Sequence, residues 1–300
     1  MLEVLVASAV LLMTPLLLAA LGEIVVERAG VLNIGIEGVM LLGAFCAAGA
    51  IQLDRGRGEG AVAALLVGAL IGLVLAYLFI ARRVNQIVGG VLFNLLALGL
   101  TTLLFVSSFD NSVTSRIYGE VAIPGLSALP FVGEALFSQP ALVYASIGVV
   151  LLVNYMLLRT WFGLHLRAAG ERPRALDTAG VSVSGVRTAA MAVGCALVGL
   201  GGGSIVLLES GAFTPNITEG RGFIALGIAL VARWRPWWAV PAVALFGIAE
   251  AIHFQAGSLG LGGVPPELLA MLPYVVAIVA VTVGTAARYP AALGVPYARE

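Results

Sequence analysis

The sequence predicts an all-α protein built from membrane-spanning helices. Of its 300 residues, 60% are apolar and only 11% are charged, and a spanning helix needs about 20 mostly apolar residues. Apolar runs follow one another along the chain without the alternation of barrel strands, so helices are expected to satisfy the backbone inside the bilayer. We therefore expect a single polytopic helix bundle over residues 1–300 with about nine spans, between eight and ten.

The first four runs cover residues 5–21, 34–51, 61–80 and 87–107. The first lacks a basic segment before it and an A-x-A exit after it, so we interpret it as a retained span and not as a signal peptide. The second follows a polar segment that is rich in glycine. The third carries Gly68 and Gly72, and small residues at this spacing let helices pack closely.

Five further runs cover residues 141–158, 188–208, 223–232, 239–254 and 268–286. The run at 188–208 contains a cluster of glycines, which we interpret as close helix packing. The run at 223–232 is too short to span alone. We expect it to take residues from the 233–238 segment or from the Gly220 side.

Arginines are distributed unequally between the two ends of the nine predicted spans. Cytoplasmic loops retain basic residues, so the richer end is predicted to be cytoplasmic, with the N-terminus outside and the C-terminus inside the cell. The poorer end holds Arg55, Arg57, Arg116 and Arg221. The richer end holds Arg28, Arg82, Arg83, Arg159, Arg167, Arg172, Arg174, Arg187, Arg233, Arg235, Arg288 and Arg299.

The residue types exclude several classes of enzyme. The chain has no lysine, which excludes a P-loop ATP site and Schiff-base chemistry. A net charge of zero gives no basic field for nucleic acid. Cys46 and Cys195 lie inside apolar runs, where a disulfide is not expected. We expect neither a cofactor nor a metal site.

Glu250 and His253 have the Glu-x-x-His spacing of di-iron bundles, which places both side chains on one helix face. That site needs a second copy, which the sequence lacks. We interpret the two as a polar pair that faces the bundle or a water-filled path, and Glu250 stays a candidate for the translocation route.

Two polar segments interrupt the apolar pattern, at residues 27–38 (ERAGVLNIGIEG) and 209–222 (ESGAFTPNITEGRG). Transporters bind solutes near discontinuous helices, so the first is either such a break or a capped turn, with Asn33 as the cap and Glu37 near a helix N-terminus. The second is either a solute entrance, or contact for a delivery protein, or a solvated loop.

The segment at 161–187 (WFGLHLRAAGERPRALDTAGVSVSGVR) is polar, carries several arginines and lies between two long apolar runs. On the predicted topology it is cytoplasmic. Pro173 is compatible with the first turn of a short helix. We interpret the segment as a docking surface, with an ordinary solvated loop as the alternative.

Four stretches resemble permease subunits of bacterial ABC importers for nucleosides and simple sugars, in the branched-chain and ribose-type permease superfamily. They are GEIVVERAGVLNIGIEGVMLLGAF at 22–45, the 163–187 segment, TEGRGFIALGIALVARWRP at 218–236 and LPYVVAIVAVTVG with AALGVPYARE at the end. The resemblance covers essentially the whole chain and is closest to the shorter of two paired nucleoside permeases.

The resemblance implies a type II importer fold, similar to the vitamin B12 permease, in the inner membrane. It also implies ATPase subunits, a second permease in a homo- or heterodimer, and an extracytoplasmic solute-binding lipoprotein, with lipid as the surroundings. The 161–187 segment then resembles the coupling segment that fits the ATPase. Its contact residues would be Gly170, Glu171, Arg172, Pro173, Arg174, Ala175 and Asp177.

A neutral polar solute such as a nucleoside is held by amides and aromatic rings more readily than by a fixed charge. Candidates for the substrate pathway are Asn33, Glu37, Phe93, Asn94, Phe213, Asn216 and Glu250. Transport would proceed by alternating access, without covalent chemistry on this chain. The alternatives are a nucleotide-independent channel or facilitator and, less favoured because catalytic sets are missing, an intramembrane enzyme.

Overall fold

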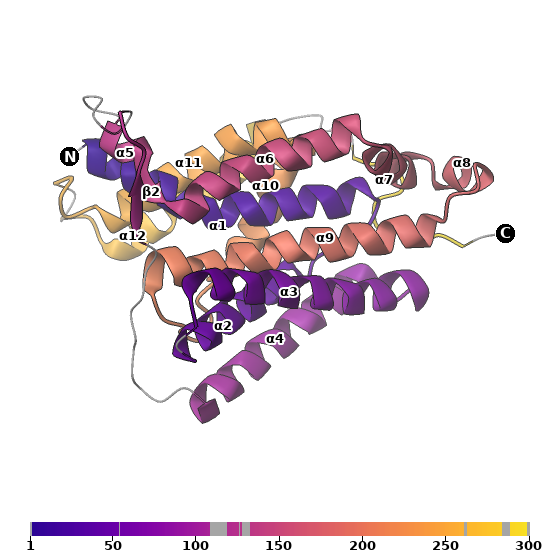
Figure 1. Cartoon of the computed structure of the whole chain (residues 1–300), viewed down its shortest axis with the longest axis horizontal. Coiled ribbons are helices and arrows are strands. Elements are labelled where there is room, and N and C mark those ends of the chain that lie inside the picture. The colour runs from indigo at the N-terminus through magenta and orange to yellow at the C-terminus, as the bar shows by residue number, and fades with distance from the viewer. Residues whose placement is uncertain are drawn as a thin grey trace.

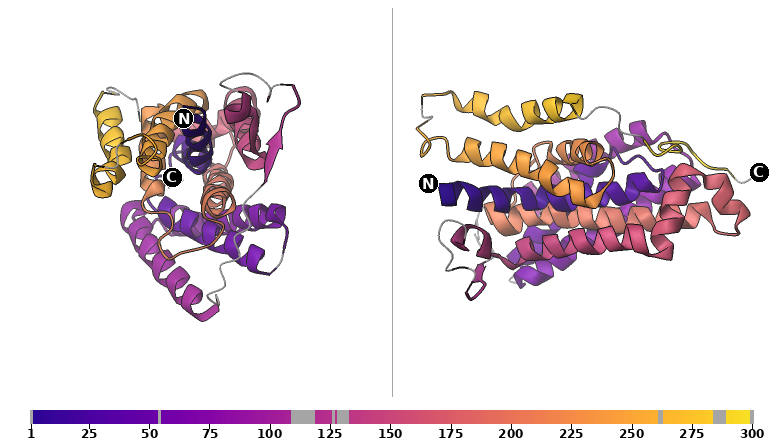
Figure 2. Two further views of the ribbon diagram at one scale, coloured as in Figure 1. Left: turned by 90° about the vertical axis from the view of Figure 1, so that its left-hand side faces the viewer. Right: turned by 90° about the horizontal axis from the view of Figure 1, so that it is seen from above.

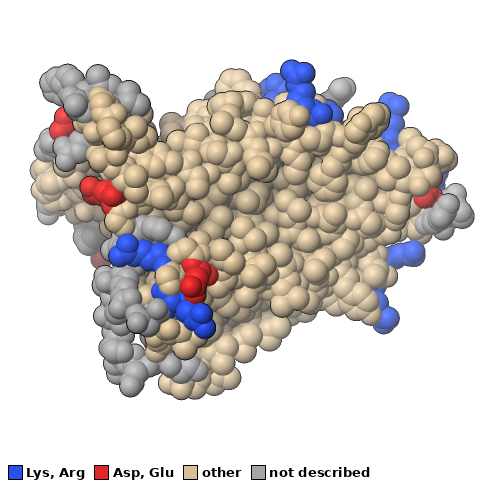
Figure 3. Space-filling view, in the orientation of Figure 1, with Lys and Arg blue, Asp and Glu red and all other residues tan. Residues whose placement is uncertain are grey.

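The computed structural model describes residues 2–53, 55–108, 119–125, 127, 133–260, 263–283 and 289–298. The protein is mostly helical, and its long helices run roughly along one direction (Figure 1). Charged side chains gather at the two ends of the face seen in Figure 3, and an uncharged belt lies between them. This arrangement is that of a protein that spans a membrane.

The N-terminal part comprises α1 (Leu2–Arg28), α2 (Ile36–Gln52), α3 (Arg57–Ala76), η1 (Tyr77–Ala81) and α4 (Gln86–Ser108). The first helix is longer than the apolar run at 5–21 that predicts it, because its last two turns remain helical through buried polar residues. The π-helical turn η1 continues α3. Both ends of α4 match the predicted run to within a residue.

A small two-stranded sheet follows α4, which the all-α prediction did not include. Strand β1 (Glu120–Ala122) pairs antiparallel with β2 (Ser138–Pro140), and the short helix α5 (Gly133–Phe137) precedes β2. The next span is α6 (Ala141–Arg159). The hairpin lies at the end of the molecule that holds the N-terminus (Figure 1).

The segment predicted as a polar loop at 161–187 is largely helical. It forms α7 (Trp161–Glu171) and α8 (Pro173–Thr178) before α9 (Val183–Ser204) and the π-helical η2 (Ile205–Ser210). The hydroxyl of Thr160 caps α7 by accepting from the amide of Gly163 at 3.1 Å. Pro173 occupies the first turn of α8, which confirms that expectation.

The C-terminal part comprises α10 (Arg221–Val231), α11 (Pro236–Phe254), α12 (Pro266–Ala270) and α13 (Leu272–Val283). The short run at 223–232 is extended on its Gly220 side and not by the 233–238 segment. Helix α13 packs on α10 and α11 at the outside of the bundle (Figure 2). Residues 289–298 then lie at the α7–α8 end (Figure 1).

Six helices of the described chain are long and apolar enough to cross a membrane. They are Glu3–Arg28, Arg57–Ala81, Gln86–Ser107, Ala141–Arg159, Val183–Ser210 and Pro236–Phe254. Three shorter apolar helices, Ile36–Gln52, Arg221–Val231 and Glu267–Ala280, occupy the other predicted runs.

Helix α9 forms the centre of the bundle and lies against α1, α2 and α3. Glycines bring the backbones together at these crossings. A Cβ on Gly72 would lie 2.8 Å from Cβ of Cys195, and a Cβ on Gly201 would lie 2.8 Å from the carbonyl oxygen of Pro15. The glycine cluster at 199–203 is therefore a packing surface, as the sequence predicts.

Candidate functional site

The chain between α1 and α2 leaves the helical path for residues 29–35, and side chains of α4 bond to this break. The amide nitrogen of Asn94 donates to the carbonyl oxygen of Ile34 at 2.9 Å, and its oxygen accepts from the main-chain amide of Gly38 at 2.9 Å. Gln86 accepts from the amide of Leu32 at 2.7 Å. These bonds satisfy main-chain groups that an interrupted helix leaves without partners in a bilayer.

Glycines allow α4 to approach the break closely. A Cβ on Gly90 would lie 2.7 Å from the main-chain nitrogen of Gly35, and a Cβ on Gly38 would lie 2.9 Å from the ring of Phe93. Phe93 therefore packs directly on the first turn of α2. The structure brings Phe93 and Asn94 together with the segment at 33–38, next to the stretch where the chain between α1 and α2 is not helical.

Glu37 connects this break to a second one. Its Oε1 accepts from the hydroxyl of Thr218 at 2.5 Å and from the amide of Gly220 at 2.9 Å, and its Oε2 accepts from the amide of Gly222 at 2.7 Å. The three donors surround the N-terminus of α10, where amide groups and the helix dipole favour a carboxylate. One carboxylate thus holds two breaks together.

The carboxylate of Glu37 uses both oxygens as acceptors, which predicts the outcome of Glu37→Gln. The side-chain amide nitrogen of Gln is itself a donor, so it would face N–H or O–H donors where one carboxylate oxygen now accepts from them. We expect a loss of about 1.5–3 kcal/mol of unfolding free energy, as for a broken hydrogen bond to a charged group. Thermal unfolding in detergent measures it, and Glu59→Gln, at an exposed residue of α3, is the control. Equal melting temperatures for both variants would refute the prediction.

Arg221, the first residue of α10, lies between two carboxylates. Its guanidinium donates to Oε2 of Glu209 at 2.7 Å and to Oε1 of Glu250 at 2.5 Å. The three side chains are 10%, 12% and 13% exposed. The sequence assigned Arg221 only to the arginines of the outer end, and the structure shows that its side chain is buried in an ion network.

The two side chains of the Glu-x-x-His pair, Glu250 and His253, have different surroundings. Glu250 faces Arg221, whereas Nδ1 of His253 is buried without a hydrogen-bond partner. Within the described residues, no group of three or more His, Cys, Asp or Glu side chains could hold a metal.

Asn33 does not cap α2, in contrast to one of the two interpretations of its segment. The residue before α2 is Gly35, which has no side chain to cap the helix, and the first-turn amide of Gly38 bonds to Asn94 of α4. The amide of Asn33 instead donates to Oε2 of Glu23 at 3.4 Å and contacts the sulfur of Cys195 at 3.7 Å. One oxygen of Glu23 and the oxygen of Asn33 have no partner in the described structure.

The two candidates of the second break lie in different surroundings. Phe213 is 3% exposed, and its ring packs edge-on against Phe45 with centroids 5.3 Å apart. Phe105 contributes a third ring at 5.8 Å. Asn216 is exposed and has a left-handed backbone with φ 62°. Only Asn216 of this pair presents a polar group at the surface.

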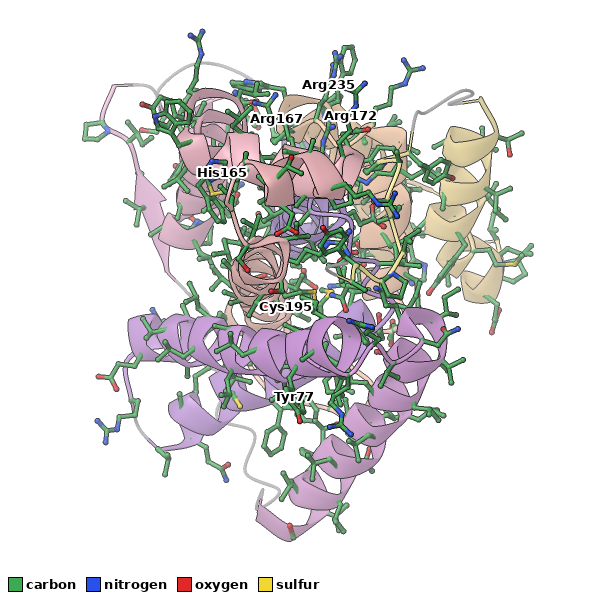
Figure 4. The ribbon with its side chains drawn as sticks, turned by 90° about the vertical axis from the view of Figure 1, so that its right-hand side faces the viewer. Tyr77, His165, Arg167, Arg172, Cys195 and Arg235 are labelled. Atoms are coloured by element: carbon green, nitrogen blue, oxygen red, sulfur yellow. The ribbon has the colours of Figure 1, made fainter. Side chains whose placement is uncertain are left out.

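The candidate coupling residues lie at the opposite end of the long helices from the N-terminus, on α7 and α8 (Figure 1). Glu171, Arg172, Arg174 and Ala175 are exposed, Pro173 and Asp177 are half-buried, and Gly170 is buried. Figure 4 views this end, with Arg167 and Arg172 labelled. The exposed residues all lie between positions 171 and 175, interrupted by half-buried Pro173, which suits a surface that another protein contacts.

Arg187, at the start of α9, holds this end together. Its guanidinium donates to the carbonyl oxygens of Ala29 at 3.1 Å, Ala169 at 3.3 Å and Val295 at 2.9 Å. One side chain therefore joins the end of α1, the end of α7 and the segment at 289–298. From the sequence, Arg187 was assigned only to the arginines of the cytoplasmic end. The structure shows that its buried side chain hydrogen-bonds to three separate segments.

The 289–298 segment also bonds directly to the candidate coupling residues. The amide of Ala292 donates to the carbonyl oxygen of Gly170 at 2.8 Å, and the hydroxyl of Tyr297 donates to Oδ2 of Asp177 at 3.1 Å. A Cβ on Gly170 would lie 3.1 Å from the amide nitrogen of Gly30. Gly170 and Asp177 thus support the surface from below while their neighbours face outward.

Comparison with known proteins then decides the family. The model of the branched-chain amino acid transport system permease component matches residues 5–281. The chain belongs to this permease family. It is not an enzyme, and the resemblance noted from its motifs is confirmed. No solved structure matches the permease.

Three curated relatives are similar over most of their length. The guanosine ABC transporter permease protein NupQ of Bacillus subtilis is 35% identical, covering 99% of this permease and 97% of the relative. The nucleoside ABC transporter permease protein NupC of Lactococcus lactis subsp. cremoris is 33% identical, covering 100% and 98%. The putative glucose ABC transporter permease protein TsgC13 of Haloferax volcanii is 37% identical, covering 86% and 79%.

Sequence reasoning missed several polar residues of the permease that the structure places at its breaks: Glu23, Glu27, Glu209, Thr218, Arg221 and Trp234. A signal for the second break was present. Asn33-Ile34 precedes Glu37-Gly38, and Asn216-Ile217 precedes Glu219-Gly220. Two similar patterns, N-I-x-x-E-G and N-I-x-E-G, thus mark the break before α2 and the break before α10.

Proposed function

We propose that this chain is the membrane-spanning permease subunit of an ATP-binding cassette importer that carries nucleosides, with ATP hydrolysis on separate subunits. The observation that carries the proposal is similarity over nearly the full length to permeases named for guanosine and for nucleosides. The glucose-named relative is similar over a smaller share of its own length. A simple sugar is therefore the second candidate for the solute.

The proposed architecture has nine spans and the type II importer fold. It is supported by the six long apolar helices together with the three shorter ones, which fill all nine predicted runs. Figure 3 shows basic side chains at both ends of this face. The α7–α8 end holds Arg159, Arg167, Arg172 and Arg174, which supports placing that end in the cytoplasm and the N-terminus outside.

The proposed site of ATPase contact is the exposed surface formed by Glu171, Arg172, Arg174 and Ala175. The proposal is supported by the exposure of these residues and by the hydrogen bonds that hold α7 in place. Arg187 and the 289–298 segment fix α7 to the end of α1, so a displacement of α8 would be transmitted to the long helices. A surface on an unsupported loop would absorb the same displacement locally.

The proposed solute route follows the two breaks, which lie side by side because Glu37 joins them. Asn94 and Glu37 already bond to backbone groups, and Glu250 already bonds to Arg221. We therefore propose that these three side chains shape the route. Asn216 is exposed, and the oxygen of Asn33 lacks a partner. These two amides are the stronger candidates for direct contact with a solute.

A second permease is proposed to complete the transporter. Only 17% of the residues in the apolar stretch of α4 are buried within this chain, and the helix crosses the bundle obliquely (Figure 1). Large apolar side chains cover its outer side, where they must contact lipid or another apolar helix. The most exposed are Leu92, Leu95, Leu96, Leu103 and Val106.

The test of function is uptake into proteoliposomes that contain this chain, its ATPase, its companion permease and its solute-binding lipoprotein. Labelled guanosine, uridine, ribose and galactose are compared with and without ATP. We expect ATP-dependent accumulation of the nucleosides alone. Uptake that runs downhill without ATP would indicate the facilitator, and ATP-dependent accumulation of sugars alone would refute the nucleoside assignment.

Charge reversal at the proposed ATPase contact gives a further prediction. Glu171→Arg is expected to lower ATP-driven uptake about tenfold or more, because like charges placed across an interface cost several kcal/mol. The same preparations are assayed for ATPase that co-purifies with the permease. The control is Glu59→Arg, an exposed glutamate at the start of α3. Full uptake and retained ATPase in Glu171→Arg would overturn this assignment.

A further inference from the structure

A pocket that the proposed function does not use lies between α1, α6, α7 and the start of α11. Its volume is about 510 Å³, and Arg28, Arg167, Arg235, Trp237 and Trp238 contribute to its wall. Arg167 and Arg235 are both labelled in the view of the α7–α8 end (Figure 4). Three arginines from three different elements thus line one hollow.

The charges of this pocket are not balanced within the described chain. Arg167 and Arg235 both act on Arg28 as like charges, and Glu171 is the opposite charge that acts on it. Hydrogen bonds reduce the imbalance little, because Nε of Arg28 donates to the neutral carbonyl oxygen of Trp234 at 3.1 Å. Nε of Arg167 donates likewise to the carbonyl oxygen of Gly163 at 3.3 Å. An anion in the pocket would relieve the repulsion among the three guanidiniums.

The rim of the pocket indicates where such an anion comes from. Trp237 and Trp238 are 53% and 60% exposed, and Leu158 of α6, which also lines the pocket, is 54% exposed. Exposed tryptophans at the ends of spans lie at the headgroup level of a bilayer. The ligand therefore meets arginines at one end and apolar side chains at the other, as a lipid would.

We propose that this pocket binds the phosphate headgroup of an anionic phospholipid from the surrounding bilayer. Basic pockets between spans at the end of a bundle suit such headgroups. The guanidiniums of Arg28, Arg167 and Arg235 would contact the phosphate, and the two tryptophans with Leu158 would contact the upper part of the acyl chains. The proposal depends on the chain spanning a membrane and not on its transported solute.

The experiment uses the purified full chain and its variants Arg235→Gln and Arg167→Gln/Arg235→Gln. Native mass spectrometry counts retained lipid after exchange into phosphatidylglycerol or phosphatidylcholine, and thermal unfolding is followed as each lipid or inorganic phosphate is added. The matched control is Arg82→Gln, an exposed arginine at the end of η1 that does not line the pocket.

We expect the unaltered chain and Arg82→Gln to retain phosphatidylglycerol selectively. The double variant should bind it about tenfold or more weakly, and Arg235→Gln should lie between them. Equal retention by the double variant would overturn the proposal, as would equal binding of phosphatidylcholine. The proposal would also be overturned if inorganic phosphate stabilised the chain as much as the lipid does and blocked the effect of the lipid. ATPase that co-purifies from the same membranes is assayed as well, and variants that lose the ATPase but keep the lipid would assign the pocket to the ATPase and overturn the proposal.

Discussion

Arg221→Gln should destabilise this protein more than any other single polar substitution considered for it. Removing the guanidinium leaves the carboxylates of Glu209 and Glu250 without the cation that both contact. Breaking a buried ion pair from one side costs about 3–5 kcal/mol, because the remaining charge stays out of water. A second unpaired carboxylate places Arg221→Gln at the upper end of that range.

The measurement is thermal unfolding of purified protein in a mild detergent, with the folded fraction followed by gel filtration. Arg82→Gln removes an arginine from an exposed position and should leave the melting temperature unchanged. Adding Glu209→Gln and Glu250→Gln to Arg221→Gln should restore much of the loss, since no charge is then left unpaired. If Arg221→Gln has the same melting temperature as the parent chain, the ion network of Arg221, Glu209 and Glu250 does not stabilise the fold.

Gly43→Ala is the second substitution with a large expected effect. A Cβ at this position would overlap the main chain of Gly199, with the Cα of Gly199 only 2.8 Å away. The obstacle is backbone in the central helix α9, so rotation of a side chain cannot relieve it. We expect a loss of about 3 kcal/mol, at the upper end of overpacking costs.

Gly49→Ala is the matched control on the same helix. It also converts glycine to alanine within α2, but a Cβ there meets nothing within 4 Å. Alanine favours helix over glycine by about 1 kcal/mol, so this variant should be as stable as the parent or more so. Folded yield and melting temperature of the two variants give the comparison. Similar losses in both would mean that the α2–α9 crossing is less tight than the backbone contact implies.

Much of the fold could be predicted from apolar runs, because a helix in lipid needs a long apolar surface. Where polar residues continue a helix, the apolar runs predict its end too early. Helix α1 ends at Arg28 and not near residue 21, because Glu23 and Glu27 find partners inside the bundle. The partners are Asn33 and Trp234, and the second lies more than 200 residues away along the chain. No local pattern reports a partner at that distance.

The positions of the two helix breaks could be predicted from the sequence, and the hydrogen bonds that join them could not. The polar segments at 27–38 and 209–222 do contain the helix breaks, so composition found their places. That Glu37 bonds to the start of α10, and Arg221 to Glu250, depends on how α2, α10 and α11 pack. The 161–187 segment was expected as a loop because its charges mask the helical pattern of α7, whose buried face includes Leu166 and Ala169.

The carboxylate of Glu37 has a consequence for how the protein moves. It belongs to α2, yet its three hydrogen bonds reach the segment before α10 and the first turn of α10 itself. If α10 shifted alone, all three bonds would break at once in a place that water cannot easily fill. We therefore expect α2 and α10 to move together in any conformational change of the bundle.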